Sequence, residues 1–217
     1  MNIEIEKLLR ERGAGIVRFV DISSLPMDQT QGFVKAVLFC IPLSKGYVQA
    51  VRDGADIDVE HDEFVDREHE TDAVADWLAG YLNQAGYRAY SQSEISNAQN
   101  GNFNPDTRSS KLPHKTIATL AGIGFIGKNN LLITDEYGCA FSMCTVLTDA
   151  PVAVESHPPL PSKCKGCDIC KQACPANAIT GNEWTEDTKR EDLVDVFKCT
   201  CALKCMVHCP QTQNYAM

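Results

Sequence analysis

The sequence predicts an α/β layered domain over residues 1–160, followed by a small cysteine-rich domain over residues 161–217. Two observations predict this organisation. Segments with the hydrophobic pattern of helices alternate with segments typical of buried strands, as they do in layered α/β proteins. Eight of the eleven cysteines fall between Cys164 and Cys209, after a proline-rich segment, HPPLPS (157–162). We therefore expect the domain boundary near residue 160.

The first half of the chain contains the clearest patterns. Residues 2–12 predict an opening helix that Gly13 ends. GIVRFVDI (15–22) and VKAVLFCIP (34–42) are rich in branched apolar residues and predict buried strands. Residues 71–85 predict a helix, because apolar residues recur there at helical spacing.

Three further elements are expected before the boundary. Residues 113–121 predict a helix with Pro113 in its first turn. NLLITDEYG (130–138) and the segment 140–149 predict two strands joined by a turn. Together these elements predict a mixed sheet flanked by helices.

Composition and charge exclude several classes of protein. The chain is 44% hydrophobic and 23% charged, as in globular rather than disordered proteins. With 20 basic and 29 acidic residues its net charge is −9, which argues against a broad nucleic-acid-binding surface. The sequence shows neither an apolar run of about eighteen residues nor the apolar segment of a secretion signal. We therefore expect no membrane span and a cytoplasmic protein.

One segment carries most of the negative charge. Residues 52–72 contain ten acidic side chains against Arg52 and Arg67. We interpret this segment as a solvated acidic loop. A docking face for a basic partner, or a metal site that uses His61 and His69, is the alternative.

The first cysteine group predicts an iron–sulfur site. Its spacing, C-x2-C-x2-C-x3-C-P, is that of bacterial ferredoxins. It consists of Cys164, Cys167, Cys170, Cys174 and Pro175. Each iron corner of a 4Fe-4S cube needs one thiolate, and three cysteines spaced two residues apart can wrap one cube. The fourth cysteine, held by the proline, points to a neighbouring cube.

The second cysteine group ends in the same Cys-Pro step and completes the eight thiolates that two cubes need. It consists of Cys199, Cys201, Cys205 and Cys209. The crossed ferredoxin pattern assigns Cys164, Cys167, Cys170 and Cys209 to cluster I, and Cys174, Cys199, Cys201 and Cys205 to cluster II. The spacing between Cys201 and Cys205 is one residue longer than in a strict motif. A 3Fe-4S centre or a vacant corner therefore stays an alternative for cluster II.

Disulfides and zinc are the competing explanations for so many cysteines. Disulfides suit a secreted chain, for which the sequence gives no sign. Zinc is typically held by CxxC pairs that lie well apart. The three remaining cysteines, Cys40, Cys139 and Cys144, lie in apolar strand patterns and are interpreted as buried small hydrophobes rather than ligands.

A glycine motif precedes the cysteine region. Gly122, Gly124 and Gly127 match GxGxxG. A dinucleotide fingerprint follows a strand and opens a helix, whereas this motif follows a helical pattern and leads into a strand. We interpret it instead as a loop whose backbone closely approaches a neighbouring element or a flat cofactor. Lys128 and Asn129 follow directly and could contact amide or phosphate groups.

Three sequence blocks together carry a resemblance. They are LPHKTIATLAGIGFIGKNNLLIT (112–134), CTVLTDAPV (144–152) and CKGCDICKQACPANAITG (164–181). In this order they resemble the epoxyqueuosine reductase family, and most of all its short, ferredoxin-type relatives; reductive dehalogenases are more distantly similar. The block AGIGFIGKN is similar to the family's AGLGWIGKN, with Phe125 at the Trp position.

This resemblance implies two 4Fe-4S clusters and a cobalamin, the corrinoid lying on an N-terminal mixed-sheet domain similar to nitroreductases. An electron-donor protein or a small reductant would supply the clusters, which would reduce cobalt and thereby the substrate. Gly122, Gly124, Lys128 and Asn129 would line the cofactor. His114 stands at the start of a predicted helix and could serve as an acid, so it is the candidate proton donor. A flavin on the same layer is the alternative cofactor.

The sequence also departs from the family. Its tRNA-acting members carry an Asp-Ser/Thr-Ala-Pro segment before the glycine block, with the Asp as proton donor. The matching stretch here is Arg108-Ser-Ser-Lys-Leu, without an aspartate. With the negative net charge, this argues against tRNA and leaves the substrate unidentified. The alternative function is a ferredoxin-type electron carrier. Nitroreductase-like layers often pair, so a homodimer is the expected assembly.

Overall fold

The structure is a computed structural model that describes residues 1–58 and 60–217. Val59, part of the acidic segment 52–72, lies outside the described residues. The chain forms two compact units, each built from three segments. Unit 1 comprises Met1–Pro42, Asp66–Ala121 and Ser142–Pro158, and unit 2 comprises Leu43–Val65, Gly122–Phe141 and Pro159–Met217. The domain boundary near residue 160 stays a prediction.

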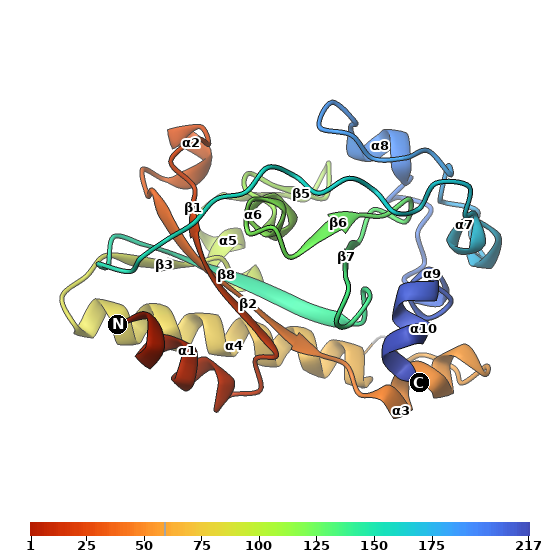
Figure 1. The fold of residues 1–217 in the computed structure, drawn as a ribbon, viewed down its shortest axis with the longest axis horizontal. Coiled ribbons are helices and arrows are strands. Elements are labelled where there is room, and N and C mark those ends of the chain that lie inside the picture. Colours follow the sequence, from red (N-terminus) through yellow and green to blue (C-terminus); the bar gives the residue numbers. More distant parts are fainter. Residues whose placement is uncertain (59) are drawn as a thin grey trace. The chain divides into compact units, whose positions relative to one another are not determined.

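A four-stranded sheet with the strand order β1-β2-β8-β3 forms the centre of unit 1 (Figure 1). Its strands are β1 (Ile16–Asp21), β2 (Lys35–Pro42), β8 (Phe141–Thr148) and β3 (Ala89–Ser91). β1 pairs with β2 and β3 pairs with β8, both antiparallel. Every residue of β2 from Ala36 to Ile41 is buried, because β2 has a neighbouring strand on each side and helices on both faces.

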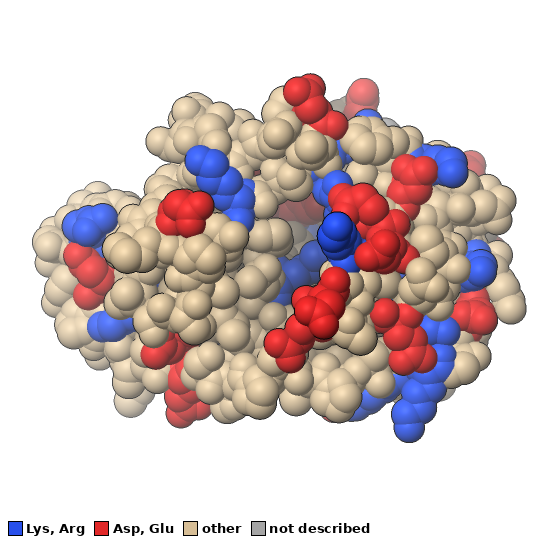
Figure 2. Space-filling view, turned by 90° about the horizontal axis from the view of Figure 1, so that it is seen from above, with Lys and Arg blue, Asp and Glu red and all other residues tan. Residues whose placement is uncertain are grey.

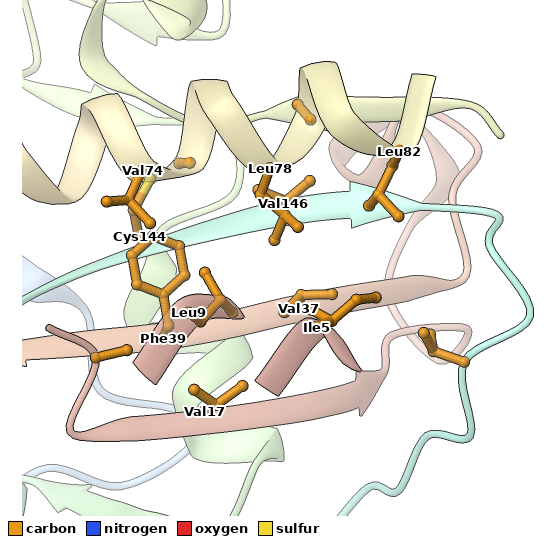
Figure 3. Packing of buried hydrophobic residues seen from close by; sticks show 14 of the residues in the cluster. Ile5, Leu9, Val17, Val37, Phe39, Val74, Leu78, Leu82, Cys144 and Val146 are labelled. Carbon is orange, nitrogen blue, oxygen red and sulfur yellow. The ribbon is translucent and has the colours of Figure 1, made fainter. Parts of the chain in front are cut away.

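Helices cover both faces of this sheet. α1 (Asn2–Arg10) and α4 (Glu63–Gln84) lie along one face and α6 (His114–Leu120) lies on the other (Figure 1). Val74, Leu78 and Leu82 of α4 form the stripe that packs on the sheet (Figure 3). The strand residues in the same core include Val17, Val37, Phe39, Cys144 and Val146. The predicted α/β class is therefore confirmed.

The acidic segment differs from its prediction. α4 begins at Glu63 rather than at Thr71. Its first turns carry acidic side chains and few apolar ones, so a hydrophobic period could not reveal them. Negative charge at a helix N-terminus is favourable because it faces the positive end of the helix dipole. The prediction of a solvated loop is therefore wrong for residues 63–72, which are helical.

Short elements complete unit 1. They are α2 (Met27–Thr30), α5 (Glu94–Gln99) and the antiparallel hairpin of β4 (Phe103–Asn104) and β5 (Ser109–Ser110). None of the helices in the described part of the chain is long and apolar enough to cross a membrane.

Unit 2 is built from short elements around two small buried clusters. Its hairpin pairs β6 (Gly124–Ile126) with β7 (Leu132–Thr134). Its helices are α3 (Lys45–Arg52), α7 (Ile169–Ala173), α8 (Arg190–Leu193), α9 (Lys204–Val207) and α10 (Pro210–Ala216). Phe125, Ile133, Met206 and Val207 share one buried cluster, so the hairpin packs on α9. Of the strand predicted over 130–138, only the residues of β7 form a strand. β6 lies inside the glycine motif, where we expected a loop.

Candidate iron-sulfur site

The first cysteine group is a tight turn followed by a short helix. The backbone N–H of Cys167 donates to the carbonyl of Cys164 at 2.8 Å, which closes the turn. α7 carries Cys170 inward, and this side chain is 9% exposed. Cys174 follows α7 in an extended conformation, and its sulfur accepts a hydrogen bond from the backbone N–H of Ala178 at 3.4 Å. The group therefore has the compact loop that its spacing predicts.

The second cysteine group lies on α9 and at the start of α10. Cys205 is on α9, and Cys209 caps α10 with Pro210 as the first helical residue. Proline suits this first position, because it lacks the N–H that would otherwise have no partner. Cys174 and Cys209, which both precede proline, both have extended backbones. The two Cys-Pro steps thus repeat one local geometry.

One cavity joins the two groups. It has a volume of about 230 Å³, and four of its lining residues are Cys164, Cys167, Cys170 and Cys209. Those four are the set that the crossed pattern assigns to cluster I. The apolar side chains of Phe125 and Ile133 line the same cavity. Four thiols around a small, partly apolar hollow fit the ligand chemistry of a 4Fe-4S cube.

A second set of thiols surrounds Cys205. Burial, together with the nearby Cys199, Cys170 and Cys174, raises the pKa of the Cys205 thiol to about 12. Three members of the predicted cluster II set therefore lie together. Cys201 is exposed, as Cys199 is, has a φ of 52°, and lines another hollow with Gly54 and the residues that follow it. The positive φ and the place in this second hollow distinguish Cys201 from the other three predicted ligands of cluster II.

The thiol arrangement differs from a single-ion site. Within residues 1–58 and 60–217, no three His, Cys, Asp or Glu side chains converge as they would around one metal ion. A cube presents four separate iron corners, so its four thiolates stand apart from one another.

The glycine motif has structural reasons for its glycines. A Cβ atom at Gly124 would lie 2.2 Å from the carbonyl oxygen of Ile133, and one at Gly127 would lie 2.5 Å from the Ile133 side chain. Gly122 has a φ of 64° just after α6. The motif thus ends a helix and lets β6 approach β7. The motif was expected to approach a neighbouring element closely, and that element is β7.

Lys128 and Asn129 face the cluster I cavity. Both are buried and both line it. The ammonium of Lys128 donates to Oδ1 of Asp168 at 2.9 Å, and Nδ2 of Asn129 donates to the carbonyl of Cys205 at 3.3 Å. The structure therefore brings these two predicted residues to the cysteines.

Cys139 has partners that the sequence did not reveal. Cys40, Cys139 and Cys144 are buried, as predicted. The sulfur of Cys139 lies 3.3 Å from Oγ1 of Thr212, and its thiol also hydrogen-bonds Cys209. That bond lowers the pKa of Cys209, which favours the thiolate form that binds metals. The contact joins residues 70 apart in sequence, for which no motif exists.

Residues 159–180 match the family described as a 4Fe-4S binding domain. An epoxyqueuosine reductase from Yersinia pestis is 32% identical over 99 residues, which are 46% of this chain and 23% of that protein. The chain resembles the epoxyqueuosine reductases. It is an iron–sulfur protein with a 4Fe-4S domain.

Solved structures show the same fold. An epoxyqueuosine reductase from Streptococcus thermophilus aligns with 98% of this chain and 66% of its own, with a TM-score of 0.60 and 15% identity. A reductive dehalogenase described as B12-dependent aligns with 96% of this chain and 31% of its own, with a TM-score of 0.69 and 20% identity. The chain thus spans less than two thirds of each relative. At these identities the likeness is one of fold and not of activity.

The segment that matches the proton-donor stretch of the epoxyqueuosine reductases is part of a hairpin. Arg108, with a φ of 50°, precedes β5, whose residues Ser109 and Ser110 pair with β4. This stretch contains no aspartate, and His114 stays the predicted proton donor.

A hydrogen-bond chain fixes the protonation of His114. Nε2 of Gln92 donates to the carbonyl of Leu112 at 3.0 Å, and Oε1 of Gln92 accepts from the hydroxyl of Thr145. Because a carbonyl can only accept, this amide has one possible orientation, and the single proton of Thr145 is committed to it. Nδ1 of His114, 2.9 Å from Oγ1 of Thr145, must therefore be the donor. Nε2 is left as a hydrogen-bond acceptor.

Burial also acts on this ring. It lowers the pKa of His114 to about 4, so the imidazole is neutral at pH 7. A neutral ring protonated at Nδ1 offers a lone pair at Nε2, which suits a base or a ligand better than an acid. The role of His114 as proton donor stays a prediction.

Proposed function

We propose that this protein is a reductase in which two 4Fe-4S clusters pass electrons to a second redox cofactor that reduces the substrate. Cobalamin is the first candidate for that cofactor and flavin the second. The observation that carries the proposal is the cavity at which Cys164, Cys167 and Cys170 meet Cys209. A cysteine of the second group completes the first, as in two-cluster ferredoxins.

The chain's own residues would hold and shield the clusters. Cluster I would be bound by Cys164, Cys167, Cys170 and Cys209, and cluster II by Cys174, Cys199, Cys201 and Cys205. When bound, each cluster supplies one-electron transfer. The Cys139 thiol stabilises the thiolate form of Cys209, and the backbone N–H of Ala178 hydrogen-bonds the sulfur of Cys174. Cys170 neighbours both sets of thiols, so the two clusters would be adjacent.

Support for cobalamin comes from the resemblance, since a fold relative is described as B12-dependent. A nitroreductase-like fold of unit 1 belongs to the same proposal. The glycine motif itself does not fit a corrinoid lying on it. The space beside Gly124 and Gly127 is filled by Ile133, so these glycines leave no cradle for a flat ring. Any corrinoid would have to be bound by other residues than these two.

An anaerobic preparation of the full chain tests the proposal by elemental analysis. Two clusters predict about eight iron and eight sulfide per chain. Cobalt in stoichiometric amount after incubation with cobalamin would support the corrinoid, and a yellow extract with flavin absorbance would replace it. Zinc in place of iron, or disulfides among the cysteines, would overturn the whole proposal.

A ferredoxin-type electron carrier is the second candidate function. Two observations favour the carrier. The space beside Gly124 is filled by Ile133, and the hollow next to the motif is lined by four cysteines, so neither leaves room for a second cofactor. A carrier would contain iron and sulfide but take up neither cobalt nor flavin, so the same preparation separates the two functions.

The partners follow from charge. The net charge is −9, and on the face drawn in Figure 2 acidic side chains are interspersed with basic ones. A tRNA ligand needs a surface rich in Lys and Arg, so we propose a small or protein-borne substrate instead. An electron-donor protein or a small reductant would supply the electrons, and a homodimer is the proposed assembly. Sedimentation analysis of the reconstituted protein tests the dimer.

A further inference from the structure

The turn after the glycine motif connects to both cysteine groups. Lys128 donates to Asp168 at 2.9 Å. In the sequence, Asp168 stands between Cys167 and Cys170 of the first group. Asn129 donates to the carbonyl of Cys205, in the second group, at 3.3 Å. Two adjacent side chains thus contact the loops that meet at the cluster I cavity.

Asn129 has a fixed orientation. Its Oδ1 accepts from the backbone N–H of Leu131 at 3.2 Å, so its Nδ2 must point toward Cys205. The same Nδ2 lies 3.8 Å from the sulfur of Cys139. This buried amide anchors the turn, and the backbone next to it therefore holds Lys128 in place.

Lys128 and Asp168 form an asymmetric ion pair. The Lys128 side chain is 7% exposed, whereas that of Asp168 is 48% exposed. Lys128 lines the cavity with the four thiols. Water screens the carboxylate far more than it screens the buried ammonium. The ion pair therefore produces a positive electrostatic potential in the cavity, even though the pair is formally neutral.

We propose that Lys128 is a fixed positive charge that raises the reduction potential of cluster I, with Asp168 moderating it. A reduced cluster carries one more negative charge than an oxidised one, so a nearby cation stabilises the reduced form more. This inference rests on the proposed iron–sulfur function and assigns Lys128 to the cluster. The sequence alone indicates only that Lys128 could contact amide or phosphate groups.

A redox titration of the reconstituted full chain, followed by electron paramagnetic resonance, tests the proposal. The signal of cluster I is identified as the one that Cys209→Ala removes. Lys128→Gln is expected to lower the midpoint potential of cluster I, because the buried charge is lost. Asp168→Asn is expected to raise it, because the ammonium is no longer compensated. Cluster II serves as the internal reference and is expected to shift less in both variants.

Two further variants make the test specific. Lys163→Gln is the matched control, because Lys163 also lines the cavity but is 52% exposed and paired with Asp135. It is expected to leave the potential of cluster I nearly unchanged. Lys128→Arg retains the charge and is expected to stay close to wild type. If Lys128→Gln fails to assemble its clusters, Asp168→Asn and Lys128→Arg still decide the question.

The outcomes separate this inference from the proposed function. Shifts of the same sign in Lys128→Gln and Asp168→Asn, or an unshifted potential in Asp168→Asn, would overturn the role of Lys128 as a tuning charge. So would an effect of Lys163→Gln as large as that of Lys128→Gln. Absence of iron and sulfide from the wild-type protein would instead overturn the iron–sulfur function itself, before any potential is measured.

Discussion

Gly138 lies directly against Thr212, so that a Cβ atom at Gly138 would fall 2.3 Å from the backbone nitrogen of Thr212. The hydroxyl of Thr212 accepts from the backbone N–H of the next residue, Cys139, at 3.1 Å. Thr212 is fully buried in the first turn of α10, the helix that Cys209 begins. The turn after β7 therefore determines where a predicted ligand of cluster I is held.

Gly138→Ala is expected to destabilise unit 2 and to lower the occupancy of cluster I. The added methyl group collides with backbone, and the φ of 58° disfavours any side chain. Together these effects should cost about 2–4 kcal/mol. Iron content and denaturant unfolding measure the two effects.

Gly46→Ala is the matched control for that substitution. Gly46 lies in α3, and a Cβ atom there would meet nothing within 4 Å. This variant should be neutral or more stable by up to about 1 kcal/mol, because alanine favours helices. Equal stability of the two glycine variants would contradict the close packing at Gly138.

Single cysteine variants should each remove one cluster. Cys209→Ala removes a thiol from the cluster I cavity, and Cys205→Ala removes one from the second set. Each variant is expected to retain about four of eight irons, and each should lose a different spectroscopic signal. Loss of the same signal in both variants would show that the crossed assignment is wrong.

Acid should destabilise the fold through His114. Its pKa of about 4 in the folded protein is below the ordinary 6.5, so the unfolded chain binds the proton first. The stabilisation is complete above pH 6.5 and is lost as the pH falls toward 4. Between pH 7 and pH 5 the loss should be about 2 kcal/mol.

The comparison with His114→Gln isolates this contribution. The pKa of Glu68 is raised to about 7, so its contribution to the unfolding free energy changes with pH in the opposite direction. The pH dependence of wild-type stability alone therefore does not isolate His114. The difference in unfolding free energy between wild type and variant should shrink as the pH falls. A difference that does not change with pH would refute the lowered pKa.

Nuclear magnetic resonance can read the His114 tautomer directly. The chain from Gln92 through Thr145 predicts a ring protonated at Nδ1 at pH 7. Thr145→Val removes the acceptor and should shift the ring toward the Nε2-protonated form. A wild-type spectrum with the proton on Nε2 would contradict the hydrogen-bond chain.

Cluster removal should loosen the cysteine region before unit 1. The buried cluster around Ala178, Ile179 and Val194 is small and includes the predicted ligand Cys170. Its order therefore depends on the metal cluster more than on apolar burial. After chelation, amide hydrogens in residues 164–209 should exchange faster, while those of β2 stay protected. Unchanged protection of the cysteine region would argue against coupled folding.

The sequence predicted those features that local patterns encode. The unbroken apolar run of β2 and the i, i+4 stripe of α4 depend only on burial and period, so β2 and the apolar part of α4 were placed correctly. The early turns of α4 were missed because they carry charge instead of a period. β6 was missed because a strand of three residues containing a glycine has no pattern of its own.

The sequence by itself determined the chemistry: cysteine spacing and the two Cys-Pro steps indicate iron–sulfur clusters, since ligand number and loop length are local properties. Only the tertiary structure decided which side chains surround those cysteines. Lys128 with Asp168, and Cys139 with Thr212, meet through contacts 40 and 73 residues apart in sequence. Such pairings depend on how the chain folds back on itself, and no spacing along the sequence records them.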